Sequence, residues 1–527
     1  MPPQKKTRTT TKAKAKSAKA GAPPDKRVTV RMFCQGLGDC FLITVPQAGA
    51  KPYSILIDCG VAMGTPQADT IMQEVVTEIA RLTDRVVDLL VVTHQHWDHV
   101  SGFVQASDAL SRITFRRLWL AWTENPIDGL AGDLRTEFAK AKVALDGATR
   151  MAASLSATDP ASAARLTALE GVTAFFGPAA APEEKDKKGK KDLNAAMAVP
   201  STLVGGKNAI DYLMPGTSRP LPGATSGLAS GIQAFVLGPP HDRAKLVHIN
   251  PSTKTPETYE KHKGDPPGLG INWGWTAGAT RSLPAAGPAL DAALDPDFAR
   301  SQPFDRKSGI SLAAAQEDPF FAEHYFGSRP ETQARRIDGD WLWSGAQRLA
   351  LRMDTYTNNT SLVLAFELPG SKDVLLFAGD AQVGNWLSWH DYDFQTSDGR
   401  KLSATNLLGS TRLYKVAHHG SHNATLKEKG LDLMTHPGLV AMLPVEADGV
   451  TRLGYGQMPL RSLVAALREK TSGRILRIDE AWSSETAPGT WDGPGASAAL
   501  AAKRISVGKA DTPSERNLFM EFVVEDR

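Results

Sequence analysis

Cysteine is scarce in this sequence, with only Cys34, Cys40 and Cys59 among 527 residues. Three thiols cannot form a disulfide framework, and so few are typical of a protein that folds in a reducing compartment. The chain has no run of about 18 apolar residues, the length that a membrane-spanning helix needs. Its basic beginning is not followed by the apolar stretch of a secretory signal. We therefore expect a cytoplasmic protein without a membrane partner.

The motifs of several common enzyme classes are absent too. The sequence has no phosphate-binding loop of the Gly-x-x-x-x-Gly-Lys-Ser/Thr type, no protein-kinase signature and no Gly-x-Ser-x-Gly elbow. These absences argue against phosphate-loop NTPases, kinases and serine hydrolases of the elbow type. Hydrophobic residues make up 42% of the chain and charged residues 22%. Both values are ordinary for a globular protein, and the chain is long enough to bury a substantial core.

The first 27 residues differ in composition from the rest. They contain nine Lys or Arg and one acid, Asp25, a net charge of +8, whereas the whole chain has +3. The remaining residues therefore carry a net charge of −5. A segment rich in Lys, Thr, Ala and Pro, with almost no large apolar residue, cannot form a core. We expect residues 1–27 to be a disordered basic tail, either a solubilising extension or a contact for nucleic acid or another polyanion.

Apolar periodicity predicts strands and helices that alternate along both halves of the chain. Residues 69–82 and 460–470 have apolar side chains spaced on one face, which is typical of helices. Strands are expected at 28–47, 53–60, 87–93, 117–122, 232–240, 359–368, 373–382, 413–425, 439–445, 474–479 and 517–524. This alternation indicates a layered α/β architecture.

Two long segments lack that alternation. Residues 125–230 are rich in Ala and contain PEEKDKKGKKD at 182–192, a charge run typical of a solvated loop. Residues 241–350 are rich in Pro and Gly and show little periodicity. We interpret residues 28–527 as one domain with two large insertions, at about 125–230 and about 241–350.

The stretch THQHWDH, residues 93–99, concentrates metal-binding side chains directly after an apolar segment. His94 and His96 are two residues apart, so they point to the same side of an extended chain. Imidazole and carboxylate groups suit zinc, and also manganese or iron. One strand end could therefore serve two adjacent metals, with His94 and His96 at one and Asp98 and His99 at the other.

Two other predicted strands also end in polar residues. LLFAGDAQ places Asp380 after an apolar run, and KVAHHGSH places His418 and His419 in the same way. A carboxylate such as Asp380 could bridge two cations. Two ions about 3.5–4 Å apart polarise an ester or phosphate and lower the pKa of a shared water to about 7. We expect two divalent ions, zinc or manganese, where these strand ends meet.

The motifs resemble those of the metallo-β-lactamase fold hydrolases. THQHWDH is similar to the T-H-x-H-x-D-H signature of that superfamily. The chain resembles in particular the branch that includes the nuclease domain of bacterial competence DNA-uptake proteins. Four further motifs carry that resemblance: GLGDCFLI (36–43), NNTSLVL (358–364), LLFAGD (375–380) and KVAHHGS (415–421). The resemblance covers roughly residues 28–120, 232–240 and 355–480. It implies a four-layer αββα sandwich, with the two insertions outside the resemblance.

This resemblance implies roles for individual residues. His94 and His96 would bind the first metal, Asp98 and His99 would bind the second, and Asp380 would bridge them. Asp98 would also be the catalytic residue that orients the attacking water or accepts its proton.

The resemblance further implies a second-metal ligand from the pair His418 and His419. We favour His418, because it follows the apolar strand more directly, and keep His419 as the alternative. Asp58 would support the site by orienting the histidine loop.

Four more residues are weaker candidates. Many members of the superfamily supply a third histidine to the first metal, and the only well-placed candidate here is His241, whose alternative is a surface position. His390 lies among Trp386, Trp389 and Tyr392, where core packing or a pocket wall is favoured over a catalytic role, and His422 could line the pocket. Asn359, in the NNTSLVL motif, could support the site.

The expected activity is hydrolysis by a metal-activated water. A phosphodiesterase or nuclease that acts on nucleic acid or nucleotides is the leading hypothesis. A hydrolase of a small ester, lactone or thioester is the alternative, because the superfamily covers all of these and the fold does not choose among them. A third hypothesis is a non-catalytic binding protein with a vestigial site.

Overall fold

The structure is a computed structural model of the chain. It describes residues 26–156, 166, 169–170, 173–177, 192–252, 256–259, 312–327, 329–333, 335, 338–453, 458–480, 504–509 and 517–527. The basic tail expected at 1–27 lies outside the described residues except for its last two. The charged loop expected at 182–192 lies outside them except for Asp192, and so does the middle of the second expected insertion.

Eight strands form the first sheet, in the order β16-β17-β1-β2-β3-β4-β5-β6. Neighbours are antiparallel from β16 to β3 and parallel from β3 to β6. The strands are β1 (Arg27–Phe33), β2 (Phe41–Val45), β3 (Tyr53–Ile57), β4 (Val86–Val92), β5 (Thr114–Ala121), β6 (Ile210–Leu213), β16 (Ile505–Lys509) and β17 (Asn517–Glu525).

Seven strands form the second sheet, in the order β15-β14-β13-β10-β9-β8-β7. Neighbours are parallel from β15 to β10 and antiparallel from β10 to β7. The strands are β7 (Thr217–Pro220), β8 (Gln233–Gly238), β9 (Val363–Glu367), β10 (Val374–Phe377), β13 (Thr411–Lys415), β14 (Val440–Leu443) and β15 (Ile475–Arg477). A separate two-stranded sheet pairs β11 (Asp393–Gln395) with β12 (Lys401–Ser403).

The two sheets share one apolar core. In β4, Leu89 and Val91 contribute to a buried cluster that also contains Leu364 and Phe366 of β9 in the other sheet. The alternate residues of β4, such as Leu90, belong to a different cluster on the opposite face. A strand with both faces buried reads as a continuous apolar run, which is why residues 87–93 look so uniform in the sequence.

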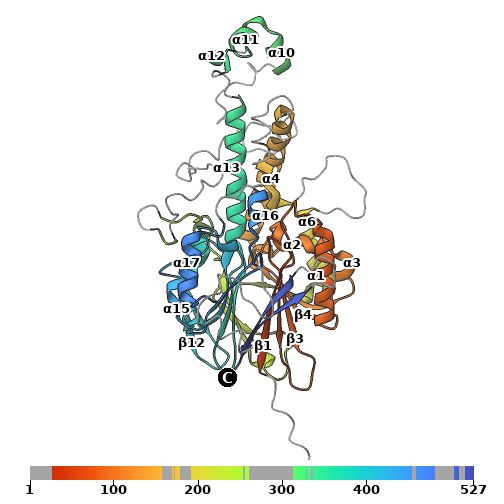
Figure 1. Ribbon diagram of the computed structural model, residues 1–527, viewed down its shortest axis with the longest axis vertical. Coiled ribbons are helices and arrows are strands. Elements are labelled where there is room, and N and C mark those ends of the chain that lie inside the picture. Colours follow the sequence, from red (N-terminus) through yellow and green to blue (C-terminus); the bar gives the residue numbers. More distant parts are fainter. Residues whose placement is uncertain are drawn as a thin grey trace, which may run out of the picture.

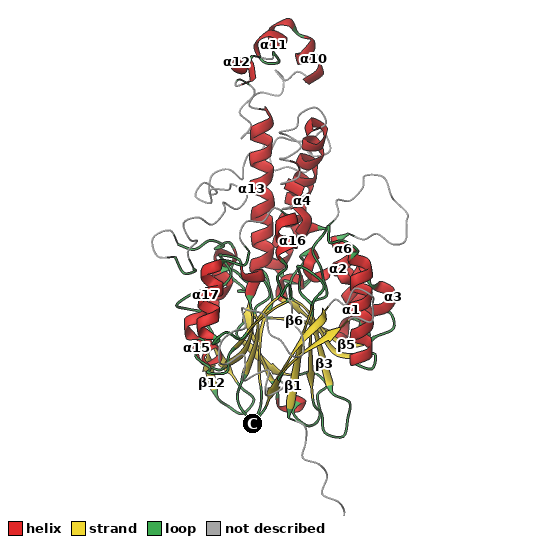
Figure 2. Cartoon of the chain, viewed as in Figure 1, coloured by secondary structure: helices red, strands yellow, loops and turns green. Residues whose placement is uncertain are grey.

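Helices cover the outer faces of both sheets (Figure 2). Those packed on the first sheet are α1 (Ala68–Leu82), α2 (Trp97–Gln105), α3 (Ser107–Leu110) and α6 (Leu193–Leu203). Those packed on the second are α14 (Val383–Ser388), α15 (Ala404–Gly409), α16 (Ala447–Arg452) and α17 (Arg461–Lys470). The fold is therefore α/β with mixed parallel and antiparallel sheets, as the alternation predicted. No helix within the described ranges is both long and apolar enough to cross a membrane.

Two long helices, α4 (Gly129–Ser156) and α13 (Asp338–Asn359), lie side by side and extend away from the sheets (Figure 1). The strand expected from residue 359 begins only at Val363, because α13 continues as far as Asn359. The remaining short helices are α7 (Arg243–Leu246), α10 (Leu312–Glu317), α11 (Pro319–His324) and α12 (Pro330–Gln333). The segment expected as the first insertion includes β6 and β7, which belong to the two sheets.

Leu364→Ala tests the shared core. Leu364 is 1% exposed and packs between the sheets, so its truncation leaves a cavity. We expect the free energy of unfolding to fall by about 2–5 kcal/mol in urea denaturation. Ile127, which is 90% exposed, provides the control, because Ile127→Ala should change stability by less than about 0.5 kcal/mol. Equal effects of the two variants would contradict the proposed core.

Candidate metal centre

The segment that carries His94 and His96 connects β4 to α2, and we call it the histidine loop. Two glycines outside this loop, Gly38 and Gly60, allow the chain to approach the backbone of Asp98 closely. Asp39 donates its backbone N–H to the carbonyl oxygen of Asp98 at 3.0 Å. A Cβ at Gly60 would lie 2.4 Å from that same oxygen, and one at Gly38 would lie 2.6 Å from it. Only glycine permits this approach, so the GLGD segment and the end of β3 together fix the position of Asp98.

Asp58 orients this loop from the end of β3. One carboxylate oxygen accepts the backbone N–H of Thr93 at 2.8 Å, and the other accepts the hydroxyl of Thr93 at 2.6 Å. The second oxygen also lies 2.8 Å from Nδ1 of His99. This contact directs the Nε2 atom of His99 toward Asp380, at 3.2 Å. Orientation of an imidazole by a carboxylate is the usual support of a metal-binding histidine.

Four side chains from three strand ends gather into one buried group, comprising Asp98, His99, Asp380 and His419. Each offers a ligand atom within 4.8 Å of the others. His419 Nε2 lies 3.0 Å from Asp98 and 3.6 Å from Asp380, while its Nδ1 lies 2.7 Å from the carbonyl oxygen of Pro444. This group could hold a metal ion. A second group, which shares His99 and adds Asp39 and Asp58, could do so as well.

The structure places His419, and not the favoured His418, within this group. Both residues have left-handed backbones, with φ of 45° and 50°, so the alternation of β13 does not continue through them. The ring of His418 instead lies 2.7 Å from the hydroxyl of Ser421 and 3.2 Å from the amide of Asn358. We expected His418, the residue nearer to the strand, to join the carboxylates. In the structure His419 joins them instead.

His94 and His96 lie at one side of the group. Nε2 of His94 is 3.1 Å from Nδ1 of His96, and the ring of His94 packs on that of His99 with centroids 4.2 Å apart. Burial lowers the pKa of His96 to about 4. Burial, followed by the neighbouring His99 and His96, holds the pKa of His94 well below its usual value. Both rings are therefore neutral at neutral pH, the form that binds metals.

His99 and His419 behave in the opposite way. Burial opposes their protonation, but Asp380 and the other nearby carboxylates hold the pKa of His99 well above its ordinary value. Asp380 and Asp98 likewise raise the pKa of His419 against the effect of burial. In the absence of a metal, protons on these two rings would partly balance the acids that a metal would otherwise balance.

Lys415 and Asp39 also belong to the site, although we did not single them out from the sequence. The ammonium group of Lys415 lies 2.5 Å from Asp39, 3.3 Å from Asp380 and 2.8 Å from the carbonyl oxygen of Gly379. The side chain is 1% exposed. Two sequence features could have indicated these residues. Lys415 lies at the end of an apolar strand, and Asp39 belongs to the GLGD motif.

In the protonation state that binds metals, the buried charges of the site would match those of two divalent cations. If its five carboxylates are ionised and its imidazoles are neutral, the ammonium of Lys415 leaves a net charge of −4, which two divalent cations would neutralise. The five acids are Asp39, Asp58, Asp98, Asp354 and Asp380. Within the described part of the chain, His96 Nε2, Asp98 Oδ1 and His99 Nε2 are buried without a hydrogen-bond partner. These donor atoms fit divalent metal ions.

The weaker candidates lie outside this group. His241 pairs with Asp128 at 3.0 Å and packs on the ring of Trp122, with its side chain 38% exposed. His390 contacts the carbonyl oxygen of Lys429 at 2.8 Å. His422 is half-buried beyond Ser421.

Asn359 has a structural role. Its amide donates to the carbonyl oxygens of Lys245 and Leu246, at 3.1 and 2.8 Å. Its oxygen accepts the backbone N–H of Asn385 at 3.0 Å. Asn359 thus joins α7 to α14, whereas its neighbour Asn358 faces His418.

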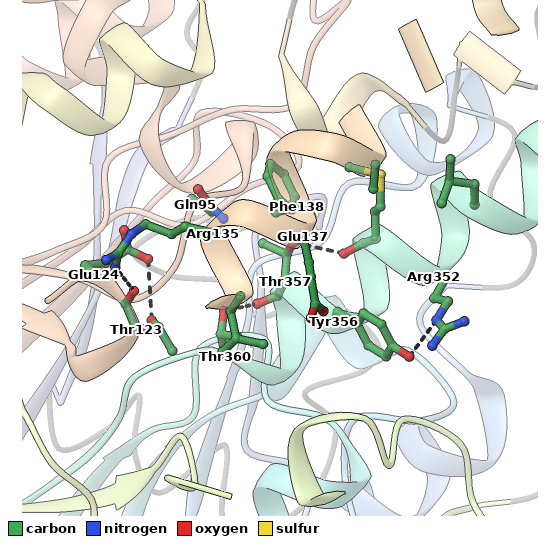
Figure 3. A pocket seen from close by; sticks show the side chains of 14 residues that line it. Gln95, Thr123, Glu124, Arg135, Glu137, Phe138, Arg352, Tyr356, Thr357 and Thr360 are labelled. Atoms are coloured by element: carbon green, nitrogen blue, oxygen red, sulfur yellow. Dashed lines mark hydrogen bonds between the residues drawn. The ribbon is translucent and has the colours of Figure 1, made fainter. Parts of the chain in front are cut away.

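A pocket of about 220 Å³ lies beside the histidine loop, between α4 and α13. Gln95, Phe138 and Tyr356 are among the residues that line it (Figure 3). Met353 lines it as well. Phe138 contacts Phe176, which in turn packs on His96, with centroids 5.8 Å apart in both pairs. One wall of the pocket is therefore continuous with the packing around a candidate metal ligand.

Comparison of the chain with models of known protein families found no match, and comparison with curated proteins found none either. The functional interpretation accordingly rests on the site geometry and on the sequence motifs.

Lys415→Met tests the electrostatic arrangement. The substitution keeps an apolar stem but leaves Asp39 and Asp380 buried without their ammonium partner. We expect the metal-free protein to lose about 3–5 kcal/mol of unfolding free energy in urea with a chelator present. The control is Lys372→Met, because the Lys372 side chain is 45% exposed and 3.9 Å from Glu367. The control should cost at most about 1 kcal/mol, and equal losses would refute the buried interaction.

Proposed function

We propose that the protein is a metal-dependent hydrolase with a metallo-β-lactamase-like αββα sandwich. Two face-packed sheets with helices on their outer faces support that layering. The observation that carries the proposal is the meeting of Asp98, His99, Asp380 and His419 in one buried group. These residues come from segments up to 321 positions apart in the chain.

The proposed metal ligands divide into two sets. His94 and His96 would hold a first ion, and Asp98, His99 and His419 would hold a second. Asp380 would lie between them. Bound zinc or manganese would supply Lewis acidity, which lowers the pKa of a coordinated water to about 7 and polarises the bond to be cleaved.

The protein side chains then position the water and the proton. Oδ1 of Asp98 is buried and has no hydrogen-bond partner among the described residues, whereas Oδ2 contacts His419. Oδ1 is therefore available to orient an attacking water and to accept its proton. Lys415 holds one oxygen of Asp380 at 3.3 Å, which fixes how that carboxylate faces the site.

The leading substrate is a phosphodiester of a nucleotide or nucleic acid. The motifs that resemble those of the nuclease branch support it, and bound cations would supply positive charge to neutralise the phosphate. Hydrolysis would form a bond between the water oxygen and phosphorus and break the bond from phosphorus to one ester oxygen. That oxygen would leave as an alcohol after it takes up the proton that Asp98 accepted from the water.

A small ester, lactone or thioester is the second candidate, and the pocket beside Gln95 favours it. Its wall is largely apolar, formed by residues such as Leu134, Phe138 and Met353. The ligand-bearing side chains are nearly inaccessible, with Asp98 and His99 at 0% exposure. A pocket of this size suits the organic part of a small substrate better than a nucleic acid strand.

Substitution of proposed ligands tests the function. With manganese or zinc, we expect the protein to hydrolyse a substrate from a panel of single-stranded DNA, RNA, cyclic nucleotides, bis-p-nitrophenyl phosphate and a lactone. His96→Ala and Asp380→Asn should each lower turnover at least about 100-fold, because even residues that only support metal ligands contribute 10–100-fold.

The control is His241→Ala, which lies outside the group and should keep wild-type turnover. Wild-type turnover in His96→Ala or Asp380→Asn would overturn the site assignment. A wild-type protein with near-zero bound metal after gentle purification would favour the non-catalytic binding protein.

Filling the pocket tests whether it receives the substrate. Ala141 lines the pocket, so Ala141→Phe should reduce its volume and raise KM for a substrate with an aromatic group about tenfold or more. Lys140→Phe is the matched control, because Lys140 is exposed and does not line the pocket. Steady-state kinetics that give equal KM for both variants would show that the pocket does not receive the substrate.

A further inference from the structure

Asp354 is an aspartate of α13 that no motif indicated. It lies one turn before Asn358, and both side chains are buried, with exposures of 5% and 0%. One oxygen of Asp354 accepts the amide N–H of Asn358 at 3.4 Å. Asn358 in turn contacts His418 at 3.2 Å. The end of α13 thus presents a carboxylate and an amide to the candidate metal centre.

The other oxygen of Asp354 faces His96. Oδ1 is 3.7 Å from Nε2 of His96, a distance too long for a hydrogen bond. Neither atom has a hydrogen-bond partner elsewhere in the described ranges, although both are buried. Unpaired buried polar atoms of this kind require an explanation, such as an ion that contacts both.

Buried carboxylates gather around Asp354. Its side chain is 5% exposed and lies near Asp98 and Asp380, which are 0% and 1% exposed. Buried carboxylates this close are costly unless cations or protons balance them.

The separation of the two unpaired atoms fits one shared ion. Zinc lies about 2.0–2.2 Å from histidine nitrogen or carboxylate oxygen, so two of its ligands can be up to about 4.2 Å apart. The observed 3.7 Å is within that limit.

We propose that Asp354 is a protein ligand, together with His96, of the first divalent ion. The inference rests on the proposed metal centre and adds a ligand to it. Asp354 occupies the role for which His241 was the sequence candidate, and His241 is engaged with Asp128 instead. Asp354 lies just beyond the second expected insertion, on a helix that begins within it, so α13 would couple that segment to the first ion.

Metal binding tests the inference directly. Full-length protein, freed of metal with a chelator, is titrated with Mn²⁺ or Zn²⁺ by calorimetry, and bound ions per chain are counted by elemental mass spectrometry. We expect the wild type to bind two ions. Asp354→Asn should keep one tight ion and bind the other at least about tenfold more weakly.

The matched control is Asp128→Asn, which also removes a carboxylate next to a histidine, but outside the site. It should bind two ions with wild-type affinity. Two ions at unchanged affinity in Asp354→Asn would overturn this inference and leave the proposed function intact. A wild-type protein that binds no ion would overturn both.

Thermal stability separates a ligand from a structural residue. Without metal, Asp354→Asn should melt close to the wild type, because the amide is nearly isosteric with the carboxyl group and its oxygen can still accept the N–H of Asn358. Saturating metal should raise the Tm of the wild type more than that of the variant. A variant that melts lower in both conditions, with the same increment from metal, would overturn the inference. If Asp354→Asn does not fold, Asp354→Ser is measured in the same way, with the same expected loss of one ion.

Discussion

The repulsion between carboxylates buried at one edge of the two sheets is the constraint on which the rest of the site depends. Asp98 and Asp380 both lie within 4 Å of His99 and His419, in surroundings from which water is largely excluded. Such a group persists only if cations or protons balance it. Lys415 supplies one fixed charge, and the two imidazoles can supply protons. The remaining imbalance is what makes the site suited to divalent metal ions.

The backbone around the site is shaped to bring these charges together. Asp58, His418 and His419 all have positive φ, which is unfavourable for residues other than glycine. Such conformations cost of order 1–3 kcal/mol each, so the surrounding structure must enforce them. The strands on either side do so, because each is paired on both edges and buried on both faces. The rigid sheets thus hold strained turns at their rim, where the turns direct side chains toward a common point.

Segments outside the two sheets contribute side chains directly to the site. Phe175 and Phe176 pack on the ring of His96 at 5.5 and 5.8 Å, and α13 brings Asp354 and Asn358 to the same region. These contacts explain why the candidate ligands are almost completely buried. They also place an apolar pocket directly beside the histidine loop, so in the proposed hydrolase the segments that cover the candidate ligands would also select the substrate. The size of that pocket is the main structural reason to consider small esters alongside phosphodiesters.

The sequence alone determined the α/β class, most strands, and the close spacing of His94, His96, Asp98 and His99. These follow from local rules, because apolar periodicity and ligand spacing act over a few residues. Strand ends rich in polar residues also indicated Asp380 and the histidine pair. The choice between His418 and His419 could not be made in this way, since left-handed backbone at both positions breaks the strand alternation that the choice used.

Lys415, Asp39 and Asp354 were recognisable only in the tertiary structure. Each is an ordinary charged residue in its own segment and becomes significant because of what surrounds it after folding. Asn359 shows the reverse, since a motif residue proved to bind backbone carbonyls rather than the site. Burial and proximity to charges from distant segments arise only when the sheets pack. These two properties decide whether a charged side chain is a solvated surface group or part of a candidate metal centre.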